Sequence, residues 1–273
     1  MSSVELSLFA FALLASGLGM GLAAGLFGIG GGVILVPVLS LLFRLDGASP
    51  DTAIHMAIGT SLAAIIPTSI ASFIAHARHG AVDKELLRLW APTIVVGSAL
   101  GSLVAHVVGG QFLSLLFGAF ALTVAFQMAR PPKKEETTTV RLPSGPWQRL
   151  LAGAIGFLSS LLGIGGGSLS VPTMVMFGMP LRNAIGTSPI IGLLISLPAT
   201  IIFMLAPAPT GHLPPGSFGH INLLAFTLLA PSSMLMAPHG ADLAHKWPPR
   251  TLQKVFAAIL LLIAAKMIVP LFL

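Results

Sequence analysis

Two glycine clusters with nearly the same sequence could bind an anion through their backbone. The first reads GLFGIGGGVILVP (residues 25–37) and the second reads SLLGIGGGSLSVP (residues 160–172). Glycine is a poor helix former, but it permits a tight turn and lets a ligand approach the backbone. A short helix that begins after each cluster would present unpaired N–H groups and the positive end of its dipole. The clusters therefore predict a site for a negatively charged ligand.

Hydroxyl side chains recur in a second repeated motif, AIGTS, at residues 57–61 and 184–188. A Gly-Thr-Ser sequence near the start of a membrane span can loosen the helix and direct hydroxyl groups at a ligand. Packing of small residues between helices is the alternative interpretation. We favour ligand contact because the motif follows both glycine clusters. The residues concerned are Gly59, Thr60, Ser61, Gly186, Thr187 and Ser188.

One side chain that can carry a positive charge precedes each AIGTS motif. Arg182 is always charged and can hold an oxyanion with two hydrogen bonds, and His55 can gain or lose a proton near neutral pH. An interfacial role, with the charge reaching the membrane surface, is the alternative for both. Ser168 and Ser170 follow the second glycine cluster, where the first is followed by apolar residues. The second half therefore offers more hydroxyl groups.

The residue types that the sequence lacks exclude several chemistries. There are no cysteines, which excludes disulfides, thiol catalysis and thiolate metal sites. The acidic residues fall in termini, loops or span ends, whereas proton and cation pathways usually place a carboxylate inside a span. No nucleophile-and-base set, HExxH motif or P-loop lysine accompanies the glycines. We therefore predict that the protein is not an enzyme and has no catalytic residues, no metal and no cofactor.

The composition indicates that lipid surrounds most of this chain. The 273 residues are 55% hydrophobic and only 8% charged, whereas about 25% of the residues in an ordinary soluble domain are charged. Apolar runs of about 20 residues, the length of a transmembrane helix, recur along the chain. The net charge of +6 lies in loops, so it predicts membrane topology rather than nucleic-acid binding.

One polar segment, ARPPKKEETTTVRLPSGPWQR, divides the chain into two halves. It is charged and contains prolines, which is typical of a linker. We predict an N-terminal transmembrane repeat at 1–130, a cytoplasmic linker at 131–147 and a C-terminal transmembrane repeat at 148–273. The predicted apolar elements are 5–45, 52–77, 86–107, 110–129, 148–178, 184–206, 220–240 and 249–272.

The halves resemble each other beyond the two motifs, since GSLVAH (101–106) matches GADLAH (240–245). Internal duplication of this kind is common in secondary transporters. The loop at 77–88 carries basic residues and its counterpart at 206–220 carries none, while the next pair of loops shows the reverse. Because basic loops stay cytoplasmic, we predict that the halves are inverted and that both termini lie outside.

Inversion requires each half to cross the membrane an odd number of times. Three uninterrupted spans follow each glycine cluster, so the first element must return to the side from which it came. The pieces 148–162 and 168–178 are also too short for two full spans. We predict an all-α polytopic membrane protein with two inverted repeats of four elements. The first element of each repeat is expected to be broken or re-entrant at GIGGG, with both turns near the membrane midplane.

Two four-element halves that each contain GIGGG…VP and then AIGTS resemble the TauE/SafE family of sulfite and organosulfonate exporters, over nearly the whole chain. The resemblance implies export of sulfite, sulfoacetate or a related anion across the bacterial cytoplasmic (inner) membrane. It also implies that the glycine clusters and Gly-Thr-Ser motifs are the binding elements. Together with the two cations above, the candidate substrate-binding residues are Gly30, Gly31, Gly32, His55, Gly59, Thr60, Ser61, Gly165, Gly166, Gly167, Ser168, Arg182, Gly186, Thr187 and Ser188.

The expected mechanism is alternating access by a secondary transporter. Its expected partners are a small anionic substrate and the lipid bilayer, with no nucleic acid, and a homodimer is left open. A permease for another small organic anion and an anion channel are the alternatives. A membrane potential is worth about 2.3 kcal/mol per elementary charge per 100 mV. With a negative cytoplasm, this term favours outward movement of an anion.

Overall fold

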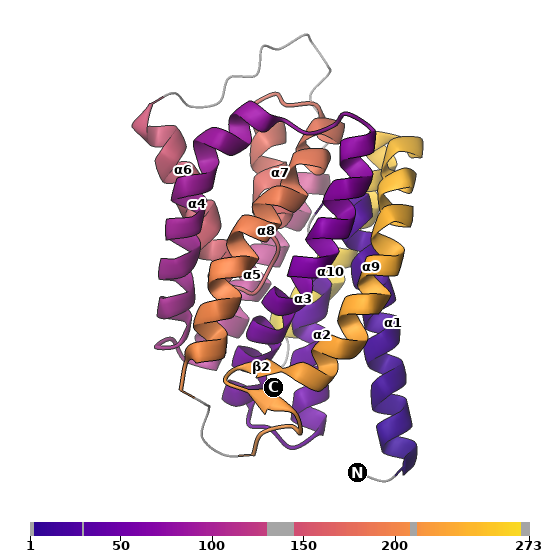
Figure 1. Ribbon diagram of the computed structural model, residues 1–273, viewed down its shortest axis with the longest axis vertical. Coiled ribbons are helices and arrows are strands. Elements are labelled where there is room, and N and C mark those ends of the chain that lie inside the picture. Colours follow the sequence, from indigo (N-terminus) through magenta and orange to yellow (C-terminus); the bar gives the residue numbers. More distant parts are fainter. Residues whose placement is uncertain (1–2, 29, 130–144, 208–211, 269–273) are drawn as a thin grey trace.

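A computed structural model describes residues 3–28, 30–129, 145–207 and 212–268. Within these residues the chain forms ten helices and one short pair of strands, arranged as an elongated bundle (Figure 1). Six of the helices are long and apolar enough to cross a membrane. The chain is therefore an all-α, multi-pass membrane protein, which confirms the fold class at this level.

The first half forms five helices. They are Ser3–Phe27 (α1), Gly32–Leu45 (α2), Pro50–Arg78 (α3), Lys84–Ala105 (α4) and Gly110–Ala129 (α5). The second half forms five more, with two short antiparallel strands before the fourth. They are Pro146–Leu161 (α6), Gly167–Met176 (α7), Leu181–Leu205 (α8), Ser217–Phe218 (β1), Ile221–Asn222 (β2), Leu223–Lys246 (α9) and Pro249–Ile268 (α10). Residues 131–144 of the predicted linker lie outside the described residues.

Polar capping residues decide where two of the spans begin. The side chains of Asp83 and Asn222 each accept a hydrogen bond from the backbone three residues later, at 3.0 and 2.7 Å. Such caps satisfy amide groups that have no partner inside the helix. The element expected at 220–240 begins only after Asn222 and continues to Lys246. The shift arises because the strand pair occupies the residues before the cap.

The two hairpins α1–α2 and α6–α7 enter the bundle from opposite ends (Figure 1). α1 begins at the end where the N-terminus lies, reverses inside the molecule, and α2 returns to that end. α6 begins at the opposite end, reverses inside the molecule, and α7 returns to its own end. Consequently α3 and α8, which follow the hairpins, run in opposite directions through the bundle.

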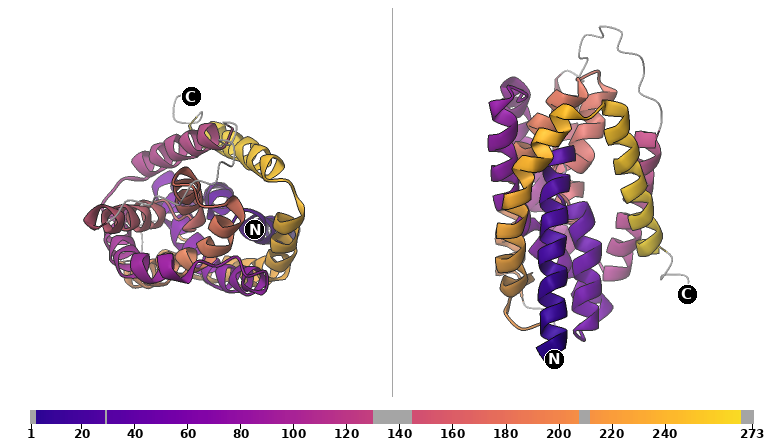
Figure 2. Two further views of the ribbon diagram at one scale, coloured as in Figure 1. Left: turned by 90° about the horizontal axis from the view of Figure 1, so that it is seen from above. Right: turned by 90° about the vertical axis from the view of Figure 1, so that its right-hand side faces the viewer.

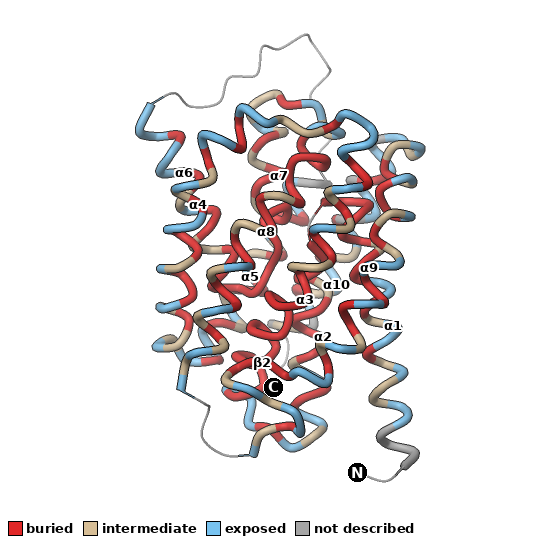
Figure 3. The backbone as a smooth tube through the Cα atoms, in the orientation of Figure 1, coloured by how far each residue is buried: buried red, intermediate tan, exposed pale blue. Residues whose placement is uncertain are grey.

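α3 is the most buried of the six candidate spans, and its first half lies in the buried interior of the bundle (Figure 3). In α3, 67% of the most apolar stretch is buried, compared with 39% in α1, α4, α5 and α9. α1 packs on α9 of the other half, α6 packs on α4, and α5 lies beside α10 (Figure 2). Glycine permits the closest approaches, since a Cβ atom on Gly25 would strike Ala237 and one on Gly97 would strike Gly153.

Candidate functional site

The two glycine turns touch each other in the buried centre. A Cβ atom on Gly30 would lie 3.0 Å from Gly165 Cα, and one on Gly32 would lie 2.6 Å from Gly163 O. Several glycines of these turns have φ between 68° and 73°, a left-handed conformation that other residues rarely adopt. They are Gly28, Gly30, Gly31 and Gly163. The structure therefore brings the two clusters together, with their described glycines buried.

The serine of each AIGTS motif binds the glycine turn of the other half. Ser61 Oγ donates a hydrogen bond of 2.9 Å to Gly163 O, and Ser188 Oγ donates one of 2.6 Å to Gly28 O. Gly28 and Gly163 are equivalent positions in the two clusters, as Ser61 and Ser188 are in the two motifs. The two hydroxyl groups therefore hold backbone carbonyls of the turns and tie the halves together.

The threonines of the motifs make a second pair of contacts between the halves. Thr60 Oγ1 accepts a hydrogen bond from Asn222 N, and Thr187 Oγ1 accepts one from Asp83 N, both at 2.9 Å. Gly59 packs against His220 O so closely that a side chain at position 59 would not fit. Asp83 and Asn222 were missed as candidates, although they precede the matching segments GSLVAH and GADLAH by the same number of residues. Each motif thus fixes the start of a span in the opposite half.

The two cationic candidates lie at opposite ends of the bundle, away from the turns. His55 is buried, and its Nδ1 and Nε2 lie 2.7 Å from Asp51 O and 3.0 Å from Ala105 O. Both ring nitrogens of His55 therefore lie within hydrogen-bond distance of backbone carbonyl oxygens, at the start of α3 and at the end of α4. Arg182 is exposed and donates from Nη2 to His245 O at 3.1 Å. The side chains of His55 and Arg182 thus contact backbone carbonyls at the C-terminal ends of α4 and α9.

The helix geometry separates these cations from the motif serines. His55 precedes Ser61 by six residues and Arg182 precedes Ser188 by six, which corresponds to a rise of about 9 Å along each helix. A ligand at the glycine turns would therefore lie deeper in the bundle than either cation. Contact of His55 and Arg182 with substrate stays a prediction.

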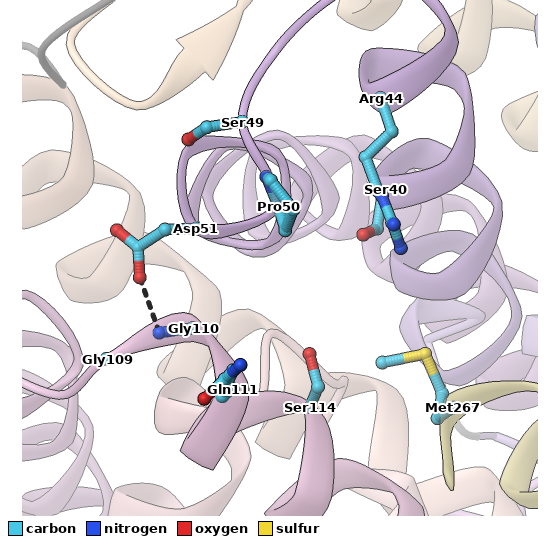
Figure 4. Close-up of a pocket in the computed structure, with 10 residues that line it drawn as sticks. All are labelled: Ser40, Arg44, Ser49, Pro50, Asp51, Gly109, Gly110, Gln111, Ser114 and Met267. Atoms are coloured by element: carbon cyan, nitrogen blue, oxygen red, sulfur yellow. Dashed lines mark hydrogen bonds between the residues drawn. The ribbon is translucent and has the colours of Figure 1, made fainter. Parts of the chain in front are cut away.

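A cavity of about 500 Å³ opens at the end of the bundle where α2 finishes (Figure 4). Arg44 and Ser40 come from α2, and Ser114 comes from α5 on the other side. Asp51 Oδ1 accepts a hydrogen bond of 2.6 Å from Gly110 N, which joins the starts of α3 and α5. From Arg44, α2 runs about 18 Å to the first glycine turn. We call this cavity the α2 vestibule, and both a basic residue, Arg44, and an acidic residue, Asp51, line it.

A cluster of histidines near α3 and α4 was not predicted from the sequence. The ring centroids of His106 and His220 lie 4.8 Å apart, and those of His55 and His220 lie 6.0 Å apart. Burial, followed by the nearby His106 and His55, lowers the pKa of His220 to about 4. Burial also lowers the pKa of His106. His220 is therefore neutral in the folded protein at neutral pH.

Acid should destabilise the fold through His220. Below the ordinary pKa of 6.5 the unfolded chain takes up a proton at this position that the folded chain refuses until about pH 4. Stability is therefore present above pH 6.5 and is lost as the pH falls toward 4. We expect the unfolding temperature of the His220→Gln variant in detergent to fall less over this range than that of the native protein. The control His239→Gln, at an exposed position on α9, should lose as much unfolding temperature as the native protein. If His220→Gln also lost as much, the lowered pKa of His220 would not explain the acid sensitivity.

Comparisons with known proteins agree on a membrane transporter. The family model described as "Sulfite exporter TauE/SafE" matches residues 13–267. A "Probable membrane transporter protein" of Haemophilus influenzae is 32% identical over 248 residues, covering 90% of this chain and 93% of the relative. The "Probable membrane transporter protein YunE" of Bacillus subtilis is 29% identical over 274 residues, covering 94% and 96%. No solved structure matches the chain.

The family match spans nearly the full length, including both glycine turns and both AIGTS motifs. The relatives are similarly long and are also described as transporters. With its multi-pass helical fold, this chain is a membrane transporter that belongs to the TauE/SafE sulfite exporter family.

Proposed function

We propose that this protein exports a small sulfur-containing anion, such as sulfite or sulfoacetate, by alternating access. The observation that carries this proposal is the contact between the two glycine turns in the buried centre. Irregular backbone at membrane depth is tolerated where it is buried in protein or lines a cavity. In transporters, half-helix N-termini at such places face anionic groups of the substrate.

The contacts between the halves support a transporter built from inverted repeats. The hairpins α1–α2 and α6–α7 open at opposite ends of the bundle. The bonds from Ser61 to Gly163 and from Ser188 to Gly28 are related by exchange of the halves. A pseudo-two-fold axis in the membrane plane would relate such contacts. Rocking of one half against the other would then expose the turns first to one face and then to the other.

The distribution of charge supports a cytoplasmic position for the end at which α6 begins. Among the described lysine and arginine side chains, Arg44 lies at the other end of the bundle. Those at the α6 end are Arg78, Lys84, Arg88, Arg149, Arg182, Lys246, Arg250 and Lys254. Positive charge is retained on the cytoplasmic side. In a bacterial inner membrane, the α2 vestibule would then face outward and the membrane potential would favour anion export.

Counterflow in proteoliposomes tests this function. Vesicles that contain the purified protein and unlabelled sulfite are placed in a trace of radiolabelled sulfite. A carrier should accumulate the label transiently and with saturation, because exchange through one site couples the two fluxes. A channel would let the label equilibrate without accumulation. Uptake equal to that of protein-free vesicles for both sulfite and sulfoacetate would overturn the proposed substrate class.

A further inference from the structure

Among the described residues, the buried hydroxyl groups of Ser69, Ser168 and Ser170 near the second glycine turn have no hydrogen-bond partner. Those of Ser159 in α6 and Thr200 in α8 also have none. Ser168 and Ser170 lie in the first turn of α7 and are 0% exposed, and Ser69 of α3 is 1% exposed. A buried hydroxyl group without a partner is destabilising, and most such groups in proteins are paired. These three positions therefore call for a partner that the protein itself does not supply.

Several other buried hydroxyl groups in the bundle bond to a carbonyl of their own helix. Thr68 Oγ1 donates to the carbonyl of Ala64, and Ser102 Oγ donates to that of Ser98, at 2.7 and 2.8 Å. This bond to the preceding turn is the usual arrangement for serine and threonine inside a helix. Ser168 stands in the first turn of α7, so no helical turn precedes it. Its hydroxyl group therefore needs a partner from outside the helix.

Ser69 lies near the amide group of Gly166, the residue that precedes α7. A Cβ atom on Gly192 of α8 would lie 2.9 Å from Ser69 Oγ and 3.6 Å from Gly166 N. The absence of a side chain at Gly192 thus leaves the serine hydroxyl group and the α7 N-terminus next to each other. Hydroxyl and amide donors that converge on one point are the groups that bind an oxyanion.

The first glycine turn has apolar residues at the equivalent positions. Val33 and Leu35 stand where the second half has Ser168 and Ser170. Ile65 takes the place of Gly192, and a Cβ atom on Gly32 would lie 2.9 Å from its Cδ1 atom. The first turn is therefore covered by hydrocarbon.

A hydrogen bond also satisfies the serine that is equivalent to Ser69. Ser196 has this position in α8, and its Oγ donates to Leu193 O at 3.4 Å. The positions equivalent to Ser69, Ser168 and Ser170 in the other half therefore leave no hydroxyl group unpaired.

We propose that the substrate oxyanion binds at the second glycine turn alone, held by Ser168, Ser69 and the first amide groups of α7. The first turn forms the opposite, apolar wall. This inference rests on the proposed function and identifies which half of the pseudo-symmetric centre holds the charge. A sulfite or sulfonate group presents three oxygens to these donors, whereas a carboxylate presents two. The site therefore favours sulfur oxyanions over carboxylates of similar size.

Binding measurements with matched serine variants test the one-sided site. Isothermal titration of the purified protein with sulfite should show that Ser168→Ala and Ser69→Ala each weaken the affinity by about ten-fold or more. Each variant loses a hydrogen bond to a charged ligand. Ser196→Ala, which is the repeat equivalent of Ser69→Ala, should bind like the native protein. Ser102→Ala removes a buried hydroxyl group that is satisfied by its own helix, and it should also be neutral. Ser168→Cys keeps the shape of the side chain with a slightly larger atom in place of oxygen, but a thiol donates weakly, so this variant should lose affinity and still fold.

The outcomes separate this inference from the function on which it rests. No binding of sulfite or sulfoacetate by the native protein would overturn both. Binding by the native protein with unchanged affinity in Ser168→Ala, Ser168→Cys and Ser69→Ala would overturn the one-sided site alone. An equal loss in Ser196→Ala and Ser69→Ala would do the same, because it would indicate a symmetric site.

Discussion

Replacement of Gly163 by alanine should abolish transport and lower the free energy of unfolding by about 2–4 kcal/mol. Gly163 has a φ of 68°, which is unfavourable for any residue with a Cβ atom. An added Cβ would also lie 2.8 Å from Ile58 Cα, so the backbone of α3 would have to move. Because Gly163 O accepts the bond from Ser61, the same movement would separate the two halves at the centre.

Thermal unfolding in detergent and counterflow in proteoliposomes would measure the two effects of Gly163→Ala. Gly19→Ala is the matched control, because Gly19 is an exposed residue of α1 with nothing within 4 Å of the added Cβ. Alanine favours the helix at that position, so stability should be unchanged or slightly higher. Equal unfolding temperatures and equal transport in the two variants would contradict a strained, tightly packed turn at Gly163.

Ser61→Ala and Ser188→Ala should damage the protein to a similar extent, although they lie in different halves. Each change leaves a buried carbonyl of the opposite turn without its donor, which costs about 1–3 kcal/mol. Transport should fall in both variants, because each loses one of the two bonds that hold the turns in place. Unfolding temperature and initial transport rate measure these effects.

Ser102→Ala provides the control for the two motif serines. Its hydroxyl group is buried but binds a carbonyl of its own helix, so its loss affects no contact between the halves. A small effect at Ser102 with larger, matching effects at Ser61 and Ser188 is the expected pattern. If only one of the two motif serines mattered, the pseudo-symmetric role of the motifs would be wrong.

Composition and local pattern were sufficient to predict the protein class and the family. A chain with 8% charged residues and recurrent apolar runs has to be surrounded by lipid, and the two repeated motifs carried the family resemblance. As predicted, helices end before the glycines, at Phe27 and Leu161, and new helices begin at Gly32 and Gly167. The sequence could predict these interruptions because glycine disfavours a helix and is the residue that readily adopts a positive φ.

The hydrogen-bond partners of the site residues could not be predicted from the sequence. Ser61 bonds to a residue 102 positions away, and Ser188 to one 160 positions away, and no local pattern encodes such pairs. Ser69 lies eight residues after Ser61 with no motif of its own, and its importance depends on a glycine in another helix. The short strand pair before α9 was likewise unexpected, since Asn222 both ends it and caps the helix.

Access to the centre from both membrane faces is the central claim, and a cysteine at Val33 tests it most directly. The native chain has no cysteine, and Val33 is a fully buried residue at the start of α2. A small, membrane-impermeant thiol reagent is applied to spheroplasts and to inside-out vesicles. Lys84→Cys and Leu45→Cys, at exposed positions near opposite ends of the bundle, report which face each preparation presents. Alternating access predicts that Val33→Cys reacts from both faces, and reaction from one face only, or from neither, would contradict the account.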